Sequence, residues 1–203
     1  MTKSLIPNFF PYYLVIAACA VAVLFSSPQN ASAQHRDYMT EEEIELVRDA
    51  QDIDFRMTVL SRMIDRRFTA LGIDTGGWKQ REKDLEKWGE APTGTRTELF
   101  SDIRKLLEKA IDDLDVIAER NDDALKQNKT DGVLFPVAVG ILEQAAKRYI
   151  PLLSAHAEKA EDERQRGLIL TAEEDCRNII AAAATIPAES KIPKKKRPAD
   201  SKN

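Results

Sequence analysis

A regular spacing of apolar residues is the feature of this sequence that most limits its possible folds. From Leu46 to Ile64 the apolar positions alternate in steps of four and three residues. This spacing places one apolar stripe along one face of an α-helix. Thr40 and Glu43 have the spacing of a capping box, and Gly72 is a typical stop. The sequence therefore predicts one long, unbroken helix over residues 41–71.

A second amphipathic segment begins near Thr95 or Thr97 and continues to about Gln127. The connection before it, residues 72–96, holds most of the glycines of the chain and reads mainly as loop. Within this connection we expect a short helix over residues 78–89. One side of that helix would carry Trp78, Leu85 and Trp88.

A third helix is predicted to begin near Phe135 and to end at Gly167. Pro136 would occupy the first helical position, where proline is tolerated. Pro151 lies inside this segment, where it removes one backbone hydrogen bond and clashes with the preceding turn. We therefore expect either a kink near Pro151 or two abutting helices.

A fourth, shorter helix is expected to begin at Thr171, with Glu174 as its capping-box partner, and to end before Pro187. Amphipathic helices of this kind hide their apolar stripes by packing together. The predicted fold is all-α. It is an up-down bundle of three long helices and a shorter C-terminal one, with coiled-coil-like packing, over residues 40–188. Residues 34–39 form a short segment before it.

The first 33 residues have the layout of a cleavable signal peptide. An apolar run of about 14 residues ends at Phe25, and Ala31-Ser32-Ala33 follows as a cleavage site. The run is shorter than the roughly 20 residues of a membrane-spanning helix. Ile16-Ala17-Ala18-Cys19 resembles a lipobox, so a lipid anchor at Cys19 stays as a minority alternative. The chain is expected to be exported to a periplasmic or extracellular location.

Charge is unevenly distributed along the chain. Without residues 1–33, which contain only Lys3, the chain has 30 − 1 = 29 basic and 34 acidic residues. Six of these basic residues lie after residue 190, in a segment that we expect to be disordered over residues 189–203. The acidic remainder argues against nucleic-acid binding. The tail predicts at most weak, salt-sensitive contact with an anionic membrane surface.

Metal and catalytic motifs are lacking in the sequence, so no cofactor is predicted. His156 is the one histidine of the predicted bundle, and we interpret it as a half-buried packing residue rather than a base or ligand. Asp115, Glu119 and Asp122 share one helix face and offer at most a weak cation site. Cys176 lies on an apolar stripe and is expected to be buried.

Three other residues are the better candidates for contact with a ligand or partner. Arg67 occupies a position of the first apolar stripe where leucine is expected. It would either pair with a polar residue of a neighbouring helix or line a small anionic-ligand pocket. Trp78 and Trp88 lie in the longest connection, with basic residues between them. They would either stack on a ring-shaped ligand or close the end of the bundle.

Together these features predict a non-enzymatic exported protein that acts through a protein partner or an envelope component. Homo-oligomerisation is left open by the surplus of apolar residues. The alternative is a periplasmic binder of a small ligand or cation, using the Trp78–Trp88 loop or the acidic face of the second helix.

Overall fold

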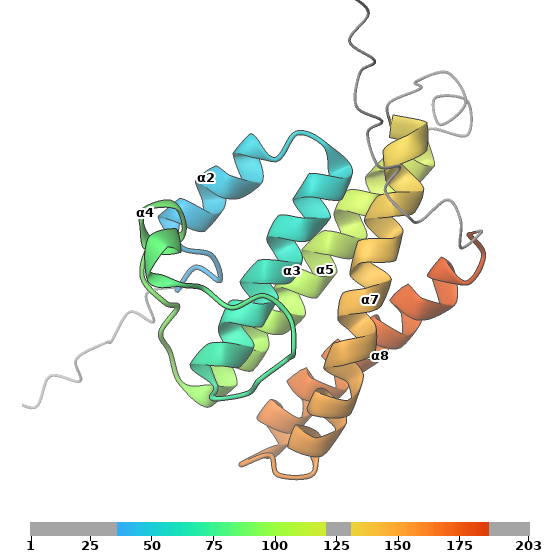
Figure 1. Cartoon of the computed structure of the whole chain (residues 1–203). Coiled ribbons are helices and arrows are strands. Elements are labelled where there is room, and N and C mark those ends of the chain that lie inside the picture. The colour runs from blue at the N-terminus through green and yellow to red at the C-terminus, as the bar shows by residue number, and fades with distance from the viewer. Residues whose placement is uncertain (1–35, 121–130, 187–203) are drawn as a thin grey trace, which may run out of the picture. The chain divides into compact units, whose positions relative to one another are not determined.

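The computed structural model describes residues 36–120 and 131–186. Contacts divide the chain into two units, Met1–Arg36 and Asp37–Asn203, and every described helix belongs to the second. Within the described ranges the regular structure is all-helical, without a strand, which confirms the predicted all-α class (Figure 1). No helix in these ranges has both the length and the apolar character needed to cross a bilayer. The predicted signal peptide and basic tail lie outside the described residues.

The predicted helix over residues 41–71 is wrong as a single element. It consists of α2, Glu41–Asp49, and α3, Ile53–Ala70, separated by Ala50–Asp52. The capping box at Thr40 is confirmed, since Thr40 and Glu43 exchange both of its hydrogen bonds.

A buried ion pair explains the break between α2 and α3. Glu43 pairs with Arg66, 23 residues away. One unbroken helix would hold the two residues about 35 Å apart, because the helix rises 1.5 Å per residue. The turn at Ala50–Asp52 lets α2 fold back along α3. The Arg56 side chain donates to the Ala50 carbonyl oxygen at 2.9 Å and so gives this backbone group of the turn a hydrogen-bond partner.

Two of the longer helices agree with their predicted positions in part. Helix α5, Arg96–Arg120, begins where expected, and its predicted end at Gln127 lies outside the described residues. Helix α7, Asp131–Ala157, begins before Phe135 and continues through Pro151 as one helix. Of the two alternatives at Pro151, two abutting helices is therefore wrong, and a kink stays a prediction. A proline inside a helix costs about 3 kcal/mol or more, through the lost backbone bond and the clash of its ring. Tyr149 and Leu153, on either side of Pro151, are fully buried and hold the helix in the core.

The fourth helix, α8, is longer than predicted and runs over Glu163–Ala183. The expected start at Thr171 and the end of the preceding helix at Gly167 are both wrong. Asp162 caps α8 instead, and its carboxylate accepts from the Gln165 amide at 2.7 Å. A glycine inside a helix costs only about 1 kcal/mol, so Gly167 does not stop α8 when the flanking residues Gln165 and Ile169 are buried.

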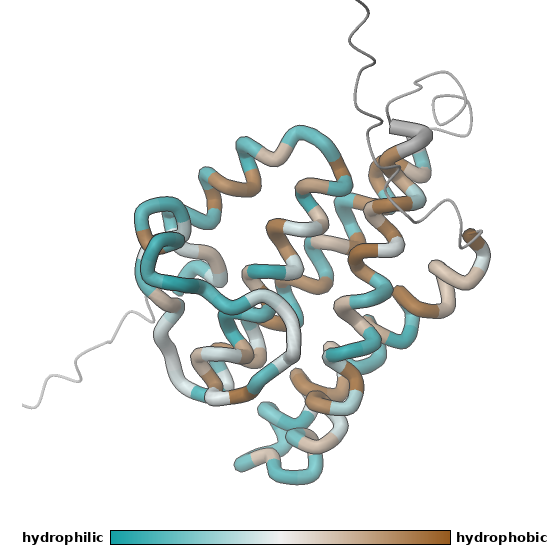
Figure 2. The backbone as a smooth tube through the Cα atoms, viewed as in Figure 1, coloured by the Kyte–Doolittle hydropathy of each residue, from teal (hydrophilic) through white to brown (hydrophobic). Residues whose placement is uncertain are grey.

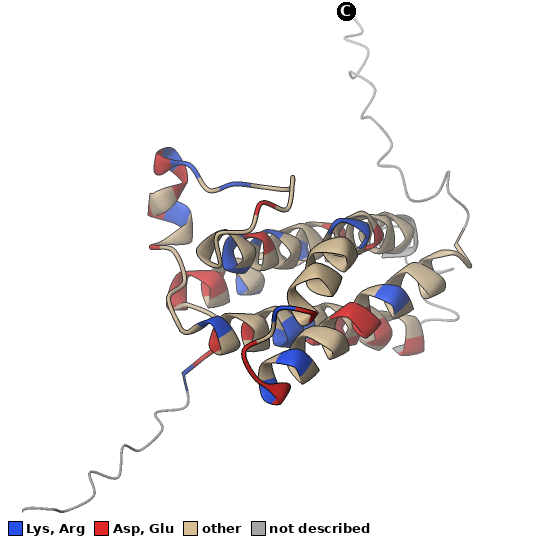
Figure 3. Ribbon diagram, turned by 90° about the horizontal axis from the view of Figure 1, so that it is seen from below, with Lys and Arg blue, Asp and Glu red and all other residues tan. Residues whose placement is uncertain are grey.

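The core lies between four helices. Helix α3 packs against α5 and α7, and α8 packs against the same two helices. Hydrophobic residues gather where these helices face one another (Figure 2). Charged residues of both signs occur on several helices (Figure 3). The predicted stripes supply much of the core, including Met57, Leu60, Ile64, Ile103, Leu107, Ala138, Leu142, Ala172 and Cys176.

The connection between α3 and α5 contains less helix than predicted. It forms a 3-10 turn, η1, Glu82–Asp84, followed by the four-residue helix α4, Leu85–Trp88. Trp78 lies in the loop before both elements. Its backbone N–H donates to the Asp65 carboxylate at 2.9 Å. Leu85 is 40% exposed, so the expected shared side of Trp78, Leu85 and Trp88 is wrong for Leu85.

Candidate functional site

Three consecutive ionisable residues near the end of α3 are buried. Asp65, Arg66 and Arg67 are 2%, 3% and 1% exposed. Successive residues of a helix point about 100° apart around its axis, so one packing face cannot bury all three. Several parts of the fold cover them: Tyr149 of α7 contacts Asp65, Glu43 of α2 contacts both arginines, and the connection also contacts Arg66.

Glu43, Arg66, Arg67 and Asp102 form what we call the charge cluster. One carboxylate oxygen of Glu43 accepts from both arginines, and the other accepts from Arg67 at 2.6 Å and from the Thr40 amide at 3.0 Å. The Nε of Arg67 lies 3.9 Å from the Asp102 carboxylate of α5. The cluster therefore links α2, α3 and α5, in agreement with the pairing interpretation of Arg67.

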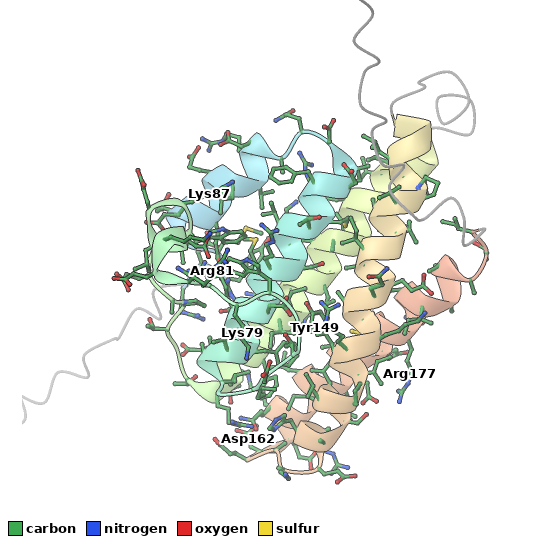
Figure 4. All side chains as sticks on the ribbon, viewed as in Figure 1. Lys79, Arg81, Lys87, Tyr149, Asp162 and Arg177 are labelled. Atoms are coloured by element: carbon green, nitrogen blue, oxygen red, sulfur yellow. The ribbon has the colours of Figure 1, made fainter. Side chains whose placement is uncertain are left out.

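Asp65 joins the connection to α3 and α7. Its carboxylate accepts from the Tyr149 hydroxyl at 3.0 Å, the Thr75 hydroxyl at 2.8 Å and the Trp78 amide at 2.9 Å. Burial, with a further contribution from the charge of Asp65, raises the pKa of Tyr149 well above 10. The Ser61 carbonyl oxygen also lies 3.0 Å from the Tyr149 hydroxyl, whose single hydrogen is shared between Asp65 and Ser61. Figure 4 shows Tyr149 between α3 and α7.

The two tryptophans lie against each other. Their ring centroids are 4.8 Å apart, and Trp88 is only 2% exposed. The guanidinium of Arg62 lies 5.5 Å from the Trp78 ring, and that of Arg66 lies 5.6 Å from the Trp88 ring. Because each ring has a tryptophan and an arginine as neighbours, the pair packs the connection against α3.

A cavity of about 370 Å³ lies beside the tryptophan pair, and we call it the connection pocket. Figure 4 shows Lys79 and Arg81 on the connection, next to α3. Neither tryptophan lines the cavity. Its wall consists of Arg66, Thr69, Lys79, Gln80, Arg81, Glu82, Leu85, Glu90 and Ala91.

Arg66 connects the charge cluster to this pocket. Its guanidinium donates to Glu43 and, at 2.5 Å, to the Glu90 carbonyl oxygen of the connection. Its Nε–H is buried and has no acceptor among the described residues. Burial lowers the pKa of Arg66, Glu43 opposes that shift and the charge of Arg67 adds to it. The Glu43 carboxylate is therefore the common partner of Arg66 and Arg67.

His156 lies apart from these residues, at the end of α7. Its Nδ1 is 2.8 Å from an Arg96 nitrogen, and its ring centroid is 6.1 Å from that of Phe100. Burial lowers the pKa of His156, and Arg96 and Lys159 lower it further. The structure thus brings Trp78 and Trp88 together, connects Arg67 to them only indirectly, through Glu43 and Arg66, and leaves His156 apart.

The other candidate groups are placed as follows. Cys176 is buried, as predicted, and burial raises its pKa to about 12. Asp115 lines a second cavity, of about 430 Å³, between α5, α7 and α8, while Asp122 lies outside the described residues. Across the described ranges, no group of three or more His, Cys, Asp or Glu residues could hold a metal ion.

The sequence reasoning missed the central roles of Glu43, Asp65 and Arg66. From the sequence, Glu43 is predicted only as a member of the capping box, and Asp65 and Arg66 receive no predicted role. The signal that was present is the run of three charges on a helix whose stripe otherwise continues to Phe68 and Leu71. Such a run is costly to bury unless each charge has its own partner.

Known proteins supply no further guide to this site. In comparisons with protein families, with curated proteins and with solved structures, none matches this chain.

Proposed function

We propose that this chain is an exported, non-enzymatic binding protein that holds a small ligand in the connection pocket. Export rests on the sequence pattern of residues 1–33. The single observation that carries the binding proposal is the construction of the pocket. One wall is Arg66, a buried arginine fixed from two sides by Glu43 and by the Glu90 carbonyl oxygen. A wall held in this way needs little rearrangement when a ligand binds, which favours affinity.

The buried residue of the pocket wall, Arg66, is suited to binding. Arginine stays protonated near neutral pH and serves as a hydrogen-bond donor, not as a general base. The Gln80 side chain adds a neutral amide, which donates to the Gly89 carbonyl oxygen at 2.8 Å. Cys176 and His156 do not line the pocket.

The finer architecture is also a proposal. We propose an up-down bundle with coiled-coil-like packing, in which α3 and α8 each pair with α5 and α7. The steps of three and four between the buried residues Met57, Leu60 and Ile64 support it. Small-angle scattering and helix-to-helix spin-label distances on the full chain would test it. Distances that fit only a splayed arrangement of α3, α5, α7 and α8 would contradict it.

The test of the binding proposal is a mixed small-molecule screen followed by NMR on the full chain. Bound probes should shift the amide signals of Lys79, Gln80 and Arg81. Thr69→Trp adds bulk at an exposed residue that lines the pocket, and it should abolish those shifts. Ala70→Trp, at the next exposed residue, does not line the pocket and should leave them unchanged. Probes that bind equally well to Thr69→Trp would rule the pocket out.

Contact with a protein or an envelope component remains a second proposal. Phe55 and Leu85 are 41% and 40% exposed, and Lys87 of α4 lies 5.8 Å from the Phe55 ring. An apolar side chain beside a cation is a suitable edge for such a contact. Cross-linking in cells should capture a neighbour through positions near Phe55, and recovery of only the monomer would count against the contact.

A further inference from the structure

We infer that the ligand of the connection pocket carries an anionic oxygen group, either a carboxylate or a phosphate monoester. This inference rests on the proposed function and specifies the class of ligand. The evidence is the arrangement of charges around the cavity: one buried cation in its wall, two exposed cations on the connection, and two exposed carboxylates. Removing a carboxylate should change the affinity for an anion in the opposite direction to removing a cation.

The buried cation is Arg66. Its side chain is 2% exposed, and that of its partner Glu43 is fully buried. Glu43 also neutralises Arg67, and the Nε–H of Arg66 has no acceptor among the described residues. A buried charge attracts an anion more strongly than an exposed charge does, because water screens it less. Arg66 contributes charge to the pocket, since its terminal nitrogens already donate to Glu43 and Glu90. The planar set of donors that matches carboxylate and phosphate oxygens is offered by the exposed Arg81.

The two exposed cations come from the connection itself. Lys79 pairs with Asp74 at 2.7 Å, and both side chains are more than 60% exposed. Arg81 pairs with Asp84 at 3.4 Å, with its own side chain 65% exposed. Exposed pairs of this kind contribute only about 0–1 kcal/mol. An incoming anion can therefore replace Asp74 and Asp84 as the partner of these cations at small cost.

The two carboxylates, Glu82 and Glu90, are exposed lining residues. They repel an anionic ligand and so reduce its affinity, since like charges at short range are unfavourable. The glutamates therefore make an opposite test possible: removing Lys79 or Arg81 should weaken anion binding, whereas removing the charge of Glu82 should strengthen it.

The experiment is a titration of the full chain with inorganic phosphate and with citrate, followed by NMR and by calorimetry. Glucose and choline serve as the neutral and cationic probes. The double variant Lys79→Ala/Arg81→Ala should weaken binding of at least one anion by about tenfold or more, because a hydrogen bond to a charged group contributes about 1.5–3 kcal/mol. Lys83→Ala removes an exposed lysine of η1 that does not line the pocket, and it should leave the affinity unchanged.

Glu82→Gln should increase the affinity for the same anion severalfold. Added salt should weaken anion binding to the unaltered protein. Binding of citrate alone identifies a carboxylate ligand, and binding of phosphate alone identifies a phosphate ligand. Saturable binding of neither anion overturns the inference. If glucose or choline shifts the Gln80 signals while both anions do not, the pocket binds a ligand of another class, and only the inference on charge fails. An equal loss of affinity in Lys83→Ala would also overturn the inference, since the loss would then reflect the overall charge of the protein and not contacts in the pocket.

Discussion

Replacing Glu43 by glutamine keeps the shape of the side chain and removes the one negative charge that both Arg66 and Arg67 share. Glu43 is fully buried, and the two arginines are 3% and 1% exposed. After Glu43→Gln, two guanidinium groups would remain buried side by side, and the Asp102 carboxylate would still lie 3.9 Å from Arg67. Removing one partner of a buried ion pair costs about 3–5 kcal/mol. This is a large part of the 5–15 kcal/mol that stabilises an ordinary domain.

A protein of this size loses about 2–4 °C of melting temperature per kcal/mol, so Tm should fall by roughly 6–20 °C. Calorimetric or circular-dichroism melts of the full chain measure the change. Glu41→Gln, in the same first turn of α2 but exposed, is the matched control and should cost no more than about 1 kcal/mol. The loss at Glu43 should persist in high salt, because buried charges are poorly screened. A loss below about 1 kcal/mol, or one that salt removes, would refute the idea that the charge cluster holds α2 against α3.

Further predictions concern two glycines, the cysteine and the histidine of the bundle. Gly77→Ala would place a Cβ 2.8 Å from the carboxylate carbon of Asp65 and should lower Tm. In Gly167→Ala, inside α8, the new Cβ meets nothing within 4 Å, so stability should rise by up to about 1 kcal/mol. Equal melting temperatures for the two variants would contradict this. With a pKa of about 12, Cys176 should react with thiol reagents only in denaturant, as peptide mapping would reveal, and rapid labelling of the native protein would speak against burial. Because the folded state lowers the pKa of His156, the unfolded chain takes up that proton more readily, and stability should fall as pH drops below about 6.5. His156→Gln should flatten this part of the Tm–pH profile, and an unchanged profile would exclude His156 as its cause.

Much of the helical content could be predicted, because spacing and capping are local properties. The capping box at Thr40 is present, and the stripes that include Leu60 and Leu107 are buried. The errors lie where a helix-breaking residue competes with capping and burial on either side of it. Gly167 is a locally sensible stop, but the cap at Asp162 and the burial of Ile169 extend α8 across it. At Pro151 one of the two predicted alternatives is wrong, because α7 includes the proline without a break, and the kink stays a prediction.

The candidate site was predictable only in outline. The importance of the Trp78–Trp88 segment and the anomaly at Arg67 follow from the sequence, because both depart from a regular pattern. The pocket itself does not, since its wall combines Arg66 of α3 with residues of the connection such as Lys79 and Glu90. No local pattern specifies which charge of the run at residues 65–67 faces which partner.

The sequence by itself therefore determined the all-helical class, the first helix start and the apolar faces, because periodicity and capping act within a few residues. The tertiary structure decided where the long first segment breaks, how α2 folds back on α3, and which buried charges meet. Those outcomes depend on ion pairs between residues 23 or more positions apart. The cost of burying Arg66 and Arg67 is offset only in an arrangement that brings Glu43 to both of them.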